Sequence, residues 1–162
     1  MASSVLLVGG ASSSGKSNLT NLIAEELCKN GYKQVVQPVS TGMKGKDWLY
    51  LLEGTDKSGN LVRIVVNTAS DDIKSINNLD SFLFANSCDI IISAIRATGN
   101  ERSDLLSVIH RHVGTTSDQI EIPLAKMVRT QFNLANVLPW YIKSMQSLGK
   151  HILRNSPFNL NI

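Results

Sequence analysis

Apolar positions along this chain fall alternately into continuous runs and into stripes at helical spacing, and this alternation predicts an α/β fold. Val5–Val8 is an unbroken apolar run, which is typical of a strand buried on both faces. The apolar residues within 19–27 recur at helical spacing, and the stripe closes at Gly31, a residue type that commonly follows a helix. A nearly unbroken run, Cys88–Ile95, predicts a central parallel strand.

The chain between these two strands predicts further extended structure. Gln34–Val39 is expected to form a strand that Pro38 and the turn after it bring to an end. Trp48–Glu53 and Leu61–Asn67 flank a loop rich in turn-forming residues, Gly54-Thr-Asp-Lys-Ser-Gly-Asn60. Together they predict an antiparallel hairpin.

The remaining stripes predict helices. We expect a helix N-capped by Ser70 or Asp71 and ending near Phe84, a helix from about Glu101 to His112, a short strand at Ser117–Ile122, a helix opened by Pro123, and a last helix from about Trp140 to Arg154. The alternation of strands and helices favours a three-layer α/β/α sandwich around a mostly parallel central sheet. At 162 residues, without a repeat or a linker, the chain is expected to be a single domain over 1–162.

Composition and charge narrow the classes of protein. The chain has 43% hydrophobic and 18% charged residues, which is typical of a folded protein. It has no apolar run near the roughly 20 residues of a membrane-spanning helix, and its N-terminus lacks the basic segment of a signal peptide. We therefore expect a cytoplasmic protein without a membrane partner. A net charge of +3 suits a small anionic ligand but offers no basic stripe for nucleic acid, and oligomerisation stays open.

The most specific motif lies between the first strand and the first helix. Gly10-Ala-Ser-Ser-Ser-Gly15-Lys16-Ser17 has the spacing G-x-x-x-x-G-K-[ST]. In this context the backbone N–H groups of the loop and the helix N-terminus converge on a polyphosphate, Lys16 reaches the β- and γ-phosphates, and the Ser17 hydroxyl ligates Mg²⁺. The alternative is a Ser- and Gly-rich turn with a solvated Lys16. The predicted nucleotide-binding residues are Gly10, Ser12, Ser13, Ser14, Gly15, Lys16 and Ser17.

Over residues 5–30 the chain resembles the P-loop NTPases of the Walker A class. The resemblance implies the P-loop NTPase fold, with ATP or GTP bound at the carboxyl edge of the sheet. Such a site usually pairs the loop with an acidic residue at a strand end. Here the candidate strand ends carry Asn67 and Ser93 instead, and the nearest carboxylates are Asp71 and Asp72. We predict Asp71 as a catalytic acid and Asp72 as a metal ligand, with helix capping as the alternative for Asp71.

Two segments are similar to small-molecule and nucleotide kinases. Ser40-Thr41-Gly42 and Gly45-Lys46-Asp47-Trp48-Leu49-Tyr50 resemble a reduced form of the substrate-binding turn and hairpin of guanylate-kinase-like enzymes. Ile92-Ser-Ala-Ile95-Arg96, followed by Asn100-Glu101, resembles bacteriophage-type deoxynucleoside monophosphate kinases, with Ala94 where those enzymes carry Asp.

These resemblances imply a Mg²⁺-dependent phosphotransferase that acts from ATP on a nucleotide or another small anionic acceptor. Arg96, just past a central strand, is the expected catalytic cation beside Lys16. The expected acceptor residues are Ser40, Thr41, Lys44 and Lys46. Candidates for a closing lid, by residue type, are Arg102, Arg111 and Arg129.

Two other functions remain open from the sequence. The order of P-loop, helix, hairpin and Asn67-Thr68-Ala69-Ser70 is similar to that of GTPase-like switches. A GTPase has Asp-x-x-Gly where this chain has Asn67-Thr68-Ala69-Ser70. It also has a guanine-reading Asn-Lys-x-Asp motif, which this chain lacks. A phosphate cradle without an evident acid also suits a non-catalytic protein that binds a nucleoside triphosphate as a regulatory ligand. A helicase or motor is disfavoured because a second domain is missing.

Overall fold

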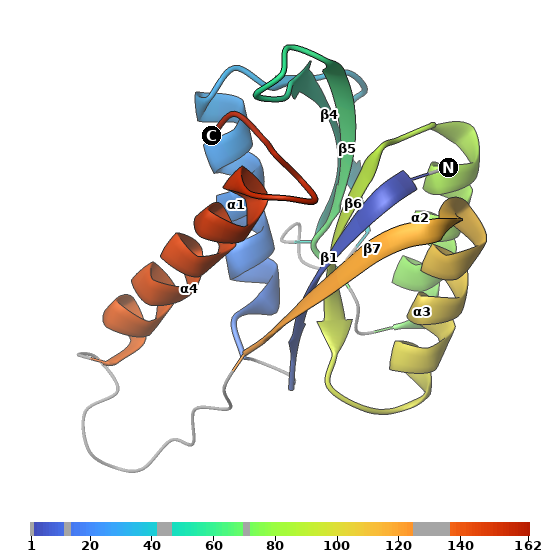
Figure 1. Ribbon diagram of the computed structural model, residues 1–162. Helices are drawn as coiled ribbons and strands as arrows, with labels where there is room; N and C mark the ends of the chain where they lie inside the picture. The colour runs from blue at the N-terminus through green and yellow to red at the C-terminus, as the bar shows by residue number, and fades with distance from the viewer. Residues whose placement is uncertain (1, 12–13, 42–46, 70–71, 125–136) are drawn as a thin grey trace.

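The computed structural model describes residues 2–11, 14–41, 47–69, 72–124 and 137–162, and in this part of the chain strands and helices alternate (Figure 1). The strands are β1 (Ala2–Gly10), β2 (Lys33–Gln34), β3 (Val39–Ser40), β4 (Trp48–Thr55), β5 (Leu61–Asn67), β6 (Ile90–Arg96) and β7 (Val113–Pro123). The helices are α1 (Lys16–Lys29), α2 (Ile73–Ala85), α3 (Asn100–His112) and α4 (Val137–Arg154). The expected α/β class is confirmed.

The strands form one mixed sheet in the order β2-β4-β5-β6-β1-β7, and β3 also pairs with β4. Neighbours among β5, β6, β1 and β7 are parallel. The pairs β2–β4, β3–β4 and β4–β5 are antiparallel. The hairpin β4–β5 has the predicted strands, and its loop is held by Asp56, whose carboxylate accepts the N–H groups of Ser58 and Asn60 at 2.8 Å each. A tight connection of this kind makes its two strands antiparallel, so the parallel part of the sheet begins at β5.

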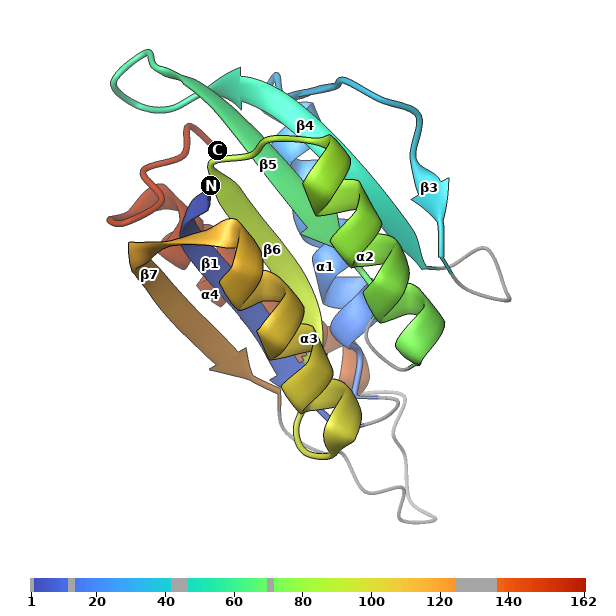
Figure 2. The same ribbon diagram turned by 90° about the vertical axis from the view of Figure 1, so that its right-hand side faces the viewer.

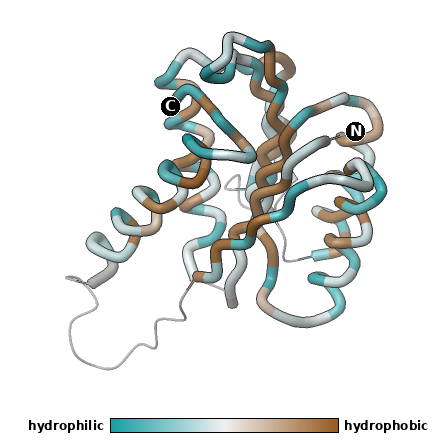
Figure 3. Tube along the Cα trace, in the orientation of Figure 1, coloured by the Kyte–Doolittle hydropathy of each residue, from teal (hydrophilic) through white to brown (hydrophobic). Residues whose placement is uncertain are grey.

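Helices cover both faces of the sheet: α1 and α4 lie on one face, and α2 and α3 lie on the other (Figures 1 and 2). Side chains alternate along β1, so that Leu6 and Val8 join the core beneath α1 and α4, whereas Val5 and Leu7 join the core beneath α2 and α3. The apolar colouring of the central strands in Figure 3 follows from this burial on both sides. The unbroken apolar run that predicted β1 therefore has a direct structural cause.

Two predicted elements are wrong in the described residues. The strand expected over Gln34–Val39 is replaced by the two-residue strands β2 and β3, because the chain bends between them and Pro38 has no N–H group to offer a neighbour. The helix expected to open at Pro123 does not begin there, since β7 continues through Pro123 and the Leu124 N–H donates to Gly9 O at 2.7 Å. The rest of that expected helix, 125–136, lies outside the described residues.

The other boundaries differ less from the predictions. The first helix and Gly31, with φ of 93°, lie where the apolar stripe placed them. The strand expected at Ser117–Ile122 extends over all of β7. Asp72 caps α2, whereas Ser70 and Asp71, the predicted capping residues, lie outside the described residues.

The segment after α4 returns to the sheet and completes the core beneath α1 and α4. Phe158, Leu160 and Ile162 are buried there, and Leu160 is fully inaccessible to solvent. The Leu160 N–H donates to Leu153 O at 2.8 Å, and Leu160 forms an isolated β-bridge with Asp56 of the hairpin loop. The tail thus packs α4 against the β4–β5 hairpin. No helix in the described ranges combines the length and the apolar character that crossing a bilayer requires.

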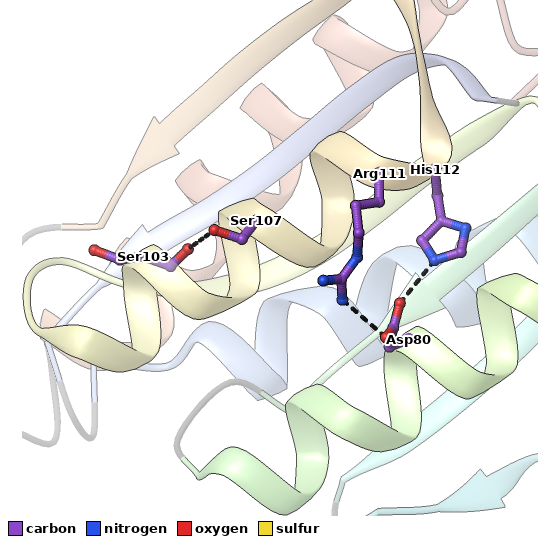
Figure 4. A network of polar contacts seen from close by, with 5 residues as sticks. All are labelled: Asp80, Ser103, Ser107, Arg111 and His112. Carbon is purple, nitrogen blue, oxygen red and sulfur yellow. Dashed lines mark hydrogen bonds and ion pairs between the residues drawn. The ribbon is translucent and has the colours of Figure 1, made fainter.

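Asp80 links the two helices on the other face of the sheet. It lies on α2 and accepts from Arg111 Nη2 and His112 Nε2 at the end of α3, each at 2.8 Å (Figure 4). The pKa of this carboxyl lies below its usual value. The hydrogen bond with His112 is the largest cause; burial acts in the opposite direction, and the hydrogen bond and charge of Arg111 lower the pKa further. The ionised form is thus favoured in the folded protein.

We expect Asp80→Asn to lower the free energy of unfolding by about 1 kcal/mol at pH 7, a small effect because the pair is partly exposed. Since the folded-state pKa of Asp80 is depressed, its contribution is fully present above the unfolded-state value near 4 and is lost as pH falls through the folded-state pKa. Urea unfolding at several pH values measures this difference. Asp104→Asn, on the exposed side of α3, is the charge-matched control, and an equal loss in both variants would contradict the assignment.

Candidate functional site

The loop between β1 and α1 lies at the carboxyl edge of the parallel strands. Gly15 has φ of 92°, a left-handed conformation that favours glycine, immediately before α1 begins at Lys16. A Cβ on Gly10 would lie 2.3 Å from Ser14 Oγ and 3.2 Å from Leu124 Cβ, so the loop closes tightly over the end of β1. Ser12 and Ser13, two of the predicted binding residues, lie outside the described residues.

The side chain of Lys16 turns back onto this loop. The residue is 4% exposed, and Nζ donates to Ala11 O at 2.8 Å. The alternative of a solvated Lys16 is therefore wrong. A buried ammonium beside the N-terminus of a helix creates a strong local preference for an anion, because both the charge and the helix dipole are positive there.

Ser14 adds a second feature that suits an anion. It is 6% exposed, and its Oγ has no hydrogen-bond partner among the described residues. Buried hydroxyl groups are usually hydrogen-bonded, so this hydroxyl can donate to a group that binds at the loop. A phosphate oxygen is an acceptor that this hydroxyl could satisfy. Ser14, Lys16 and the loop glycines thus form an arrangement that is suited to a polyphosphate.

Ser17, which is half-buried, contacts the end of β5. Its Oγ donates to Thr68 O at 2.8 Å. Thr68 is in turn fixed to the first residue of β4, since its N–H donates to Trp48 O at 3.0 Å and its Oγ1 accepts the Trp48 N–H at 2.7 Å. The first turn of α1 is therefore connected to two neighbouring strand ends.

The two strand ends that lack the expected acid are occupied by a neutral polar pair. Asn67 and Ser93 are opposite each other in the register of β5 and β6, and both are fully buried. Asn67 Nδ2 donates to Ser93 Oγ at 2.9 Å and to Ala69 O at 2.7 Å. The Ala69 N–H also donates to Asn67 Oδ1 at 3.3 Å. These side chains are used to fix the chain after β5, on the sheet face away from α1.

Asp72, the predicted metal ligand, caps α2. Its Oδ1 accepts the Ser75 N–H at 2.8 Å and its Oδ2 accepts the Ser75 hydroxyl at 3.1 Å. Asp71 lies outside the described residues. Within the described ranges no three His, Cys, Asp or Glu residues gather closely enough to hold a metal ion. The potential metal ligands near the loop are hydroxyl oxygens such as Ser17 Oγ. Oxygen ligands fit a Mg²⁺ ion whose other ligands are phosphate and water.

Arg96 ends β6 beside the loop. It is opposite Gly10 in the strand register, and the N–H of the next residue, Ala97, donates to Gly10 O at 3.1 Å. Arg96 Nη1 lies 3.6 Å from Glu101 Oε1 at the start of α3. The structure therefore places Arg96 beside the loop between β1 and α1.

Glu121 is a charged residue at this edge that sequence reasoning missed. Its carboxylate binds Arg102 through two hydrogen bonds of 3.0 and 2.7 Å, which raise the pKa of Arg102. A Cβ on Gly9 would lie 2.1 Å from Glu121 Oε1, so Gly9 leaves the space that this carboxylate fills. An acidic residue between Ile120 and Ile122 of β7, together with a glycine at the end of β1, was the available signal. Arg102 thus connects α3 to β7. By residue type it is a candidate for a closing lid, and the structure shows that it also has this structural contact.

The other predicted residues are divided between the two edges of the sheet. Thr41 is buried near the start of α2, where its carbonyl accepts the Ser75 hydroxyl at 3.4 Å, and Ser40 pairs with Trp48. Arg111 lies at the far end of α3, in the ion pair with Asp80 and away from the loop. Lys44, Lys46 and Arg129 lie outside the described residues.

Helix α4 closes the other flank of the loop. Tyr141 and Met145 from α4 line a small apolar pocket together with Ser14, Gly15 and Leu124. The loop therefore lies between this pocket and the polar contacts at the ends of β5 and β6. Comparisons with family models, with curated proteins and with solved structures find no match to this chain.

Proposed function

We propose that this chain is a single nucleoside triphosphate-binding domain over 1–162 with the P-loop NTPase fold, a three-layer sandwich in which the parallel strands β5, β6, β1 and β7 carry the site. The observation that supports this most directly is the buried Lys16, whose Nζ donates to Ala11 O at 2.8 Å. The Ser14 hydroxyl of the same loop has no hydrogen-bond partner among the described residues. Both the motif and the local geometry favour an anion-binding site at the N-terminus of α1.

We further propose that the bound nucleotide is ATP and that its γ-phosphate is transferred to a nucleotide or another small anionic acceptor. In this proposal the loop N–H groups surround the β-phosphate, Lys16 neutralises oxygens of the β- and γ-phosphates, and Arg96 stabilises charge on the transferred group. Ser17 would hold Mg²⁺, and the ion would lower the effective negative charge of the phosphates. Asp72, whose two carboxylate oxygens accept from Ser75 in the cap of α2, is the proposed second ligand once Mg²⁺ arrives with the phosphates, and Asp71 is the proposed acidic catalytic residue. Ser40, Thr41, Lys44 and Lys46 would receive the acceptor. We also propose a cytoplasmic location.

A second candidate function is nucleotide binding without catalysis. The neutral Asn67–Ser93 pair favours it, because these side chains occupy the strand ends where an acid was expected and bond to each other. A GTPase-like protein is a weaker form of the same alternative, since Asn67 supplies no carboxylate.

Two measurements test these proposals. Titration calorimetry with ATP, GTP and their diphosphates in Mg²⁺ should show binding with a preference for ATP. Incubation with γ-labelled ATP and a panel of nucleoside monophosphates should then show label on an acceptor. Tight GTP binding with slow hydrolysis would favour the GTPase-like alternative, and binding without turnover over hours would favour the non-catalytic one. Absence of any triphosphate binding at millimolar concentration would contradict the proposed function.

A further inference from the structure

The Ser17 hydroxyl is held by a main-chain carbonyl at the place where a P-loop site would use a carboxylate. We propose that Thr68 is a positioning residue for the nucleotide site: its carbonyl accepts the hydrogen bond of the Ser17 hydroxyl and thereby directs the oxygen lone pairs of Ser17 toward a phosphate-bound cation. This inference rests on the proposed binding of a nucleoside triphosphate at the loop.

The position of the Thr68 carbonyl is determined by contacts on both sides. Thr68 is fully buried, and both its N–H and its Oγ1 are bonded to the backbone of Trp48, at 3.0 and 2.7 Å. The residues on either side of it, Asn67 and Ala69, are bonded to each other at 2.7 and 3.3 Å. The peptide that carries the carbonyl is therefore held at the end of β5, within 2.8 Å of Ser17 Oγ.

A hydroxyl group has one hydrogen to donate and two lone pairs to offer. When its hydrogen is committed to Thr68 O, the lone pairs of Ser17 point away from β5. A carbonyl is neutral, so it orients the hydroxyl without adding the negative charge that would bind a divalent cation by itself. The cation should then bind with the phosphates and not before them, and Thr68 should affect nucleotide affinity only when Mg²⁺ is present.

The test compares ATP affinity in Mg²⁺ and in EDTA for Thr68→Val, which removes the hydroxyl that anchors the peptide but keeps the side-chain volume. Loss of one hydrogen bond predicts an affinity about three- to tenfold weaker in Mg²⁺, with little change in EDTA. Thr68→Ser retains the hydroxyl and should remain close to the unsubstituted protein. Ser17→Ala should also lose affinity in Mg²⁺ alone, and the double variant should be no weaker than Ser17→Ala, because the two residues act through one contact.

Three outcomes would overturn the inference: an equal loss for Thr68→Val in Mg²⁺ and in EDTA, additive losses in the double variant, or wild-type affinity for Thr68→Val in Mg²⁺. Thermal unfolding shows whether each variant is folded, and Thr68→Ala replaces Thr68→Val if valine does not fit. Failure of the unsubstituted protein to bind ATP in either buffer would instead contradict the proposed function, so the two failures are distinguishable.

Discussion

Replacement of Lys16 by alanine should weaken ATP binding by about 100-fold or more while the protein remains folded. The ammonium is buried in the loop, where it donates to the neutral carbonyl of Ala11 at 2.8 Å. A triphosphate would place charged oxygens at the same position, and their loss of the ammonium would leave buried negative charge uncompensated. Titration calorimetry with Mg²⁺ and ATP measures the change.

Lys150→Ala is the matched control for this prediction. Lys150 lies on α4 and its ammonium binds Glu26 near the end of α1, several turns from the loop. The variant removes the same side-chain type and the same charge, and it should retain ATP affinity. A folded Lys16→Ala protein with unchanged affinity, or an equal loss in both variants, would contradict the role given to Lys16.

The second large effect concerns stability: Leu160→Ala should lower the free energy of unfolding by about 2–5 kcal/mol. Leu160 is fully buried in the core beneath α1 and α4, and it is held between Leu153 and the hairpin loop. Truncation to alanine removes apolar contact and leaves a cavity that the neighbouring elements can fill only in part. Urea unfolding followed by far-UV circular dichroism measures the change.

Leu148→Ala is the control, since Leu148 lies on α4 and is 41% exposed. It removes the same atoms from a partly solvated position and should cost less than about 1 kcal/mol. If the two variants lost equal stability, the tail would not be part of the core. ATP affinity at a temperature where both variants are folded should be unchanged, because the segment that carries Leu160 lies near the end of α1 that is remote from the loop (Figure 1).

The local part of the fold was predictable because it depends on neighbours in sequence. The run Val5–Val8, the stripe of α1 and Gly31 are patterns of a few residues, and the structure places the strand, the loop and the helix there. The hairpin β4–β5 was predictable for the same reason, because its turn residues lie between two largely apolar segments.

What depends on strand register was not predictable. The Asn67–Ser93 pair forms because β5 and β6 align these residues, and a shift by one residue would turn each side chain to the other face. Glu121 reaches Gly9 only through the pairing of β7 with β1. The polar start of β7 has no alternation of apolar and polar residues, so the sequence predicts only the later part of this strand. Pro38 lies between the short strands β2 and β3, whereas the sequence predicts a single strand there.

The resting place of Lys16 has a consequence for how a ligand would associate. Because the ammonium is already buried and donates to Ala11 O, an incoming anion does not have to strip a full hydration shell from it. The dehydration of the amine is completed during folding, before any encounter. Association should therefore be governed by how fast the small anion diffuses to a preorganised donor, and it should require little rearrangement of the helix that carries it.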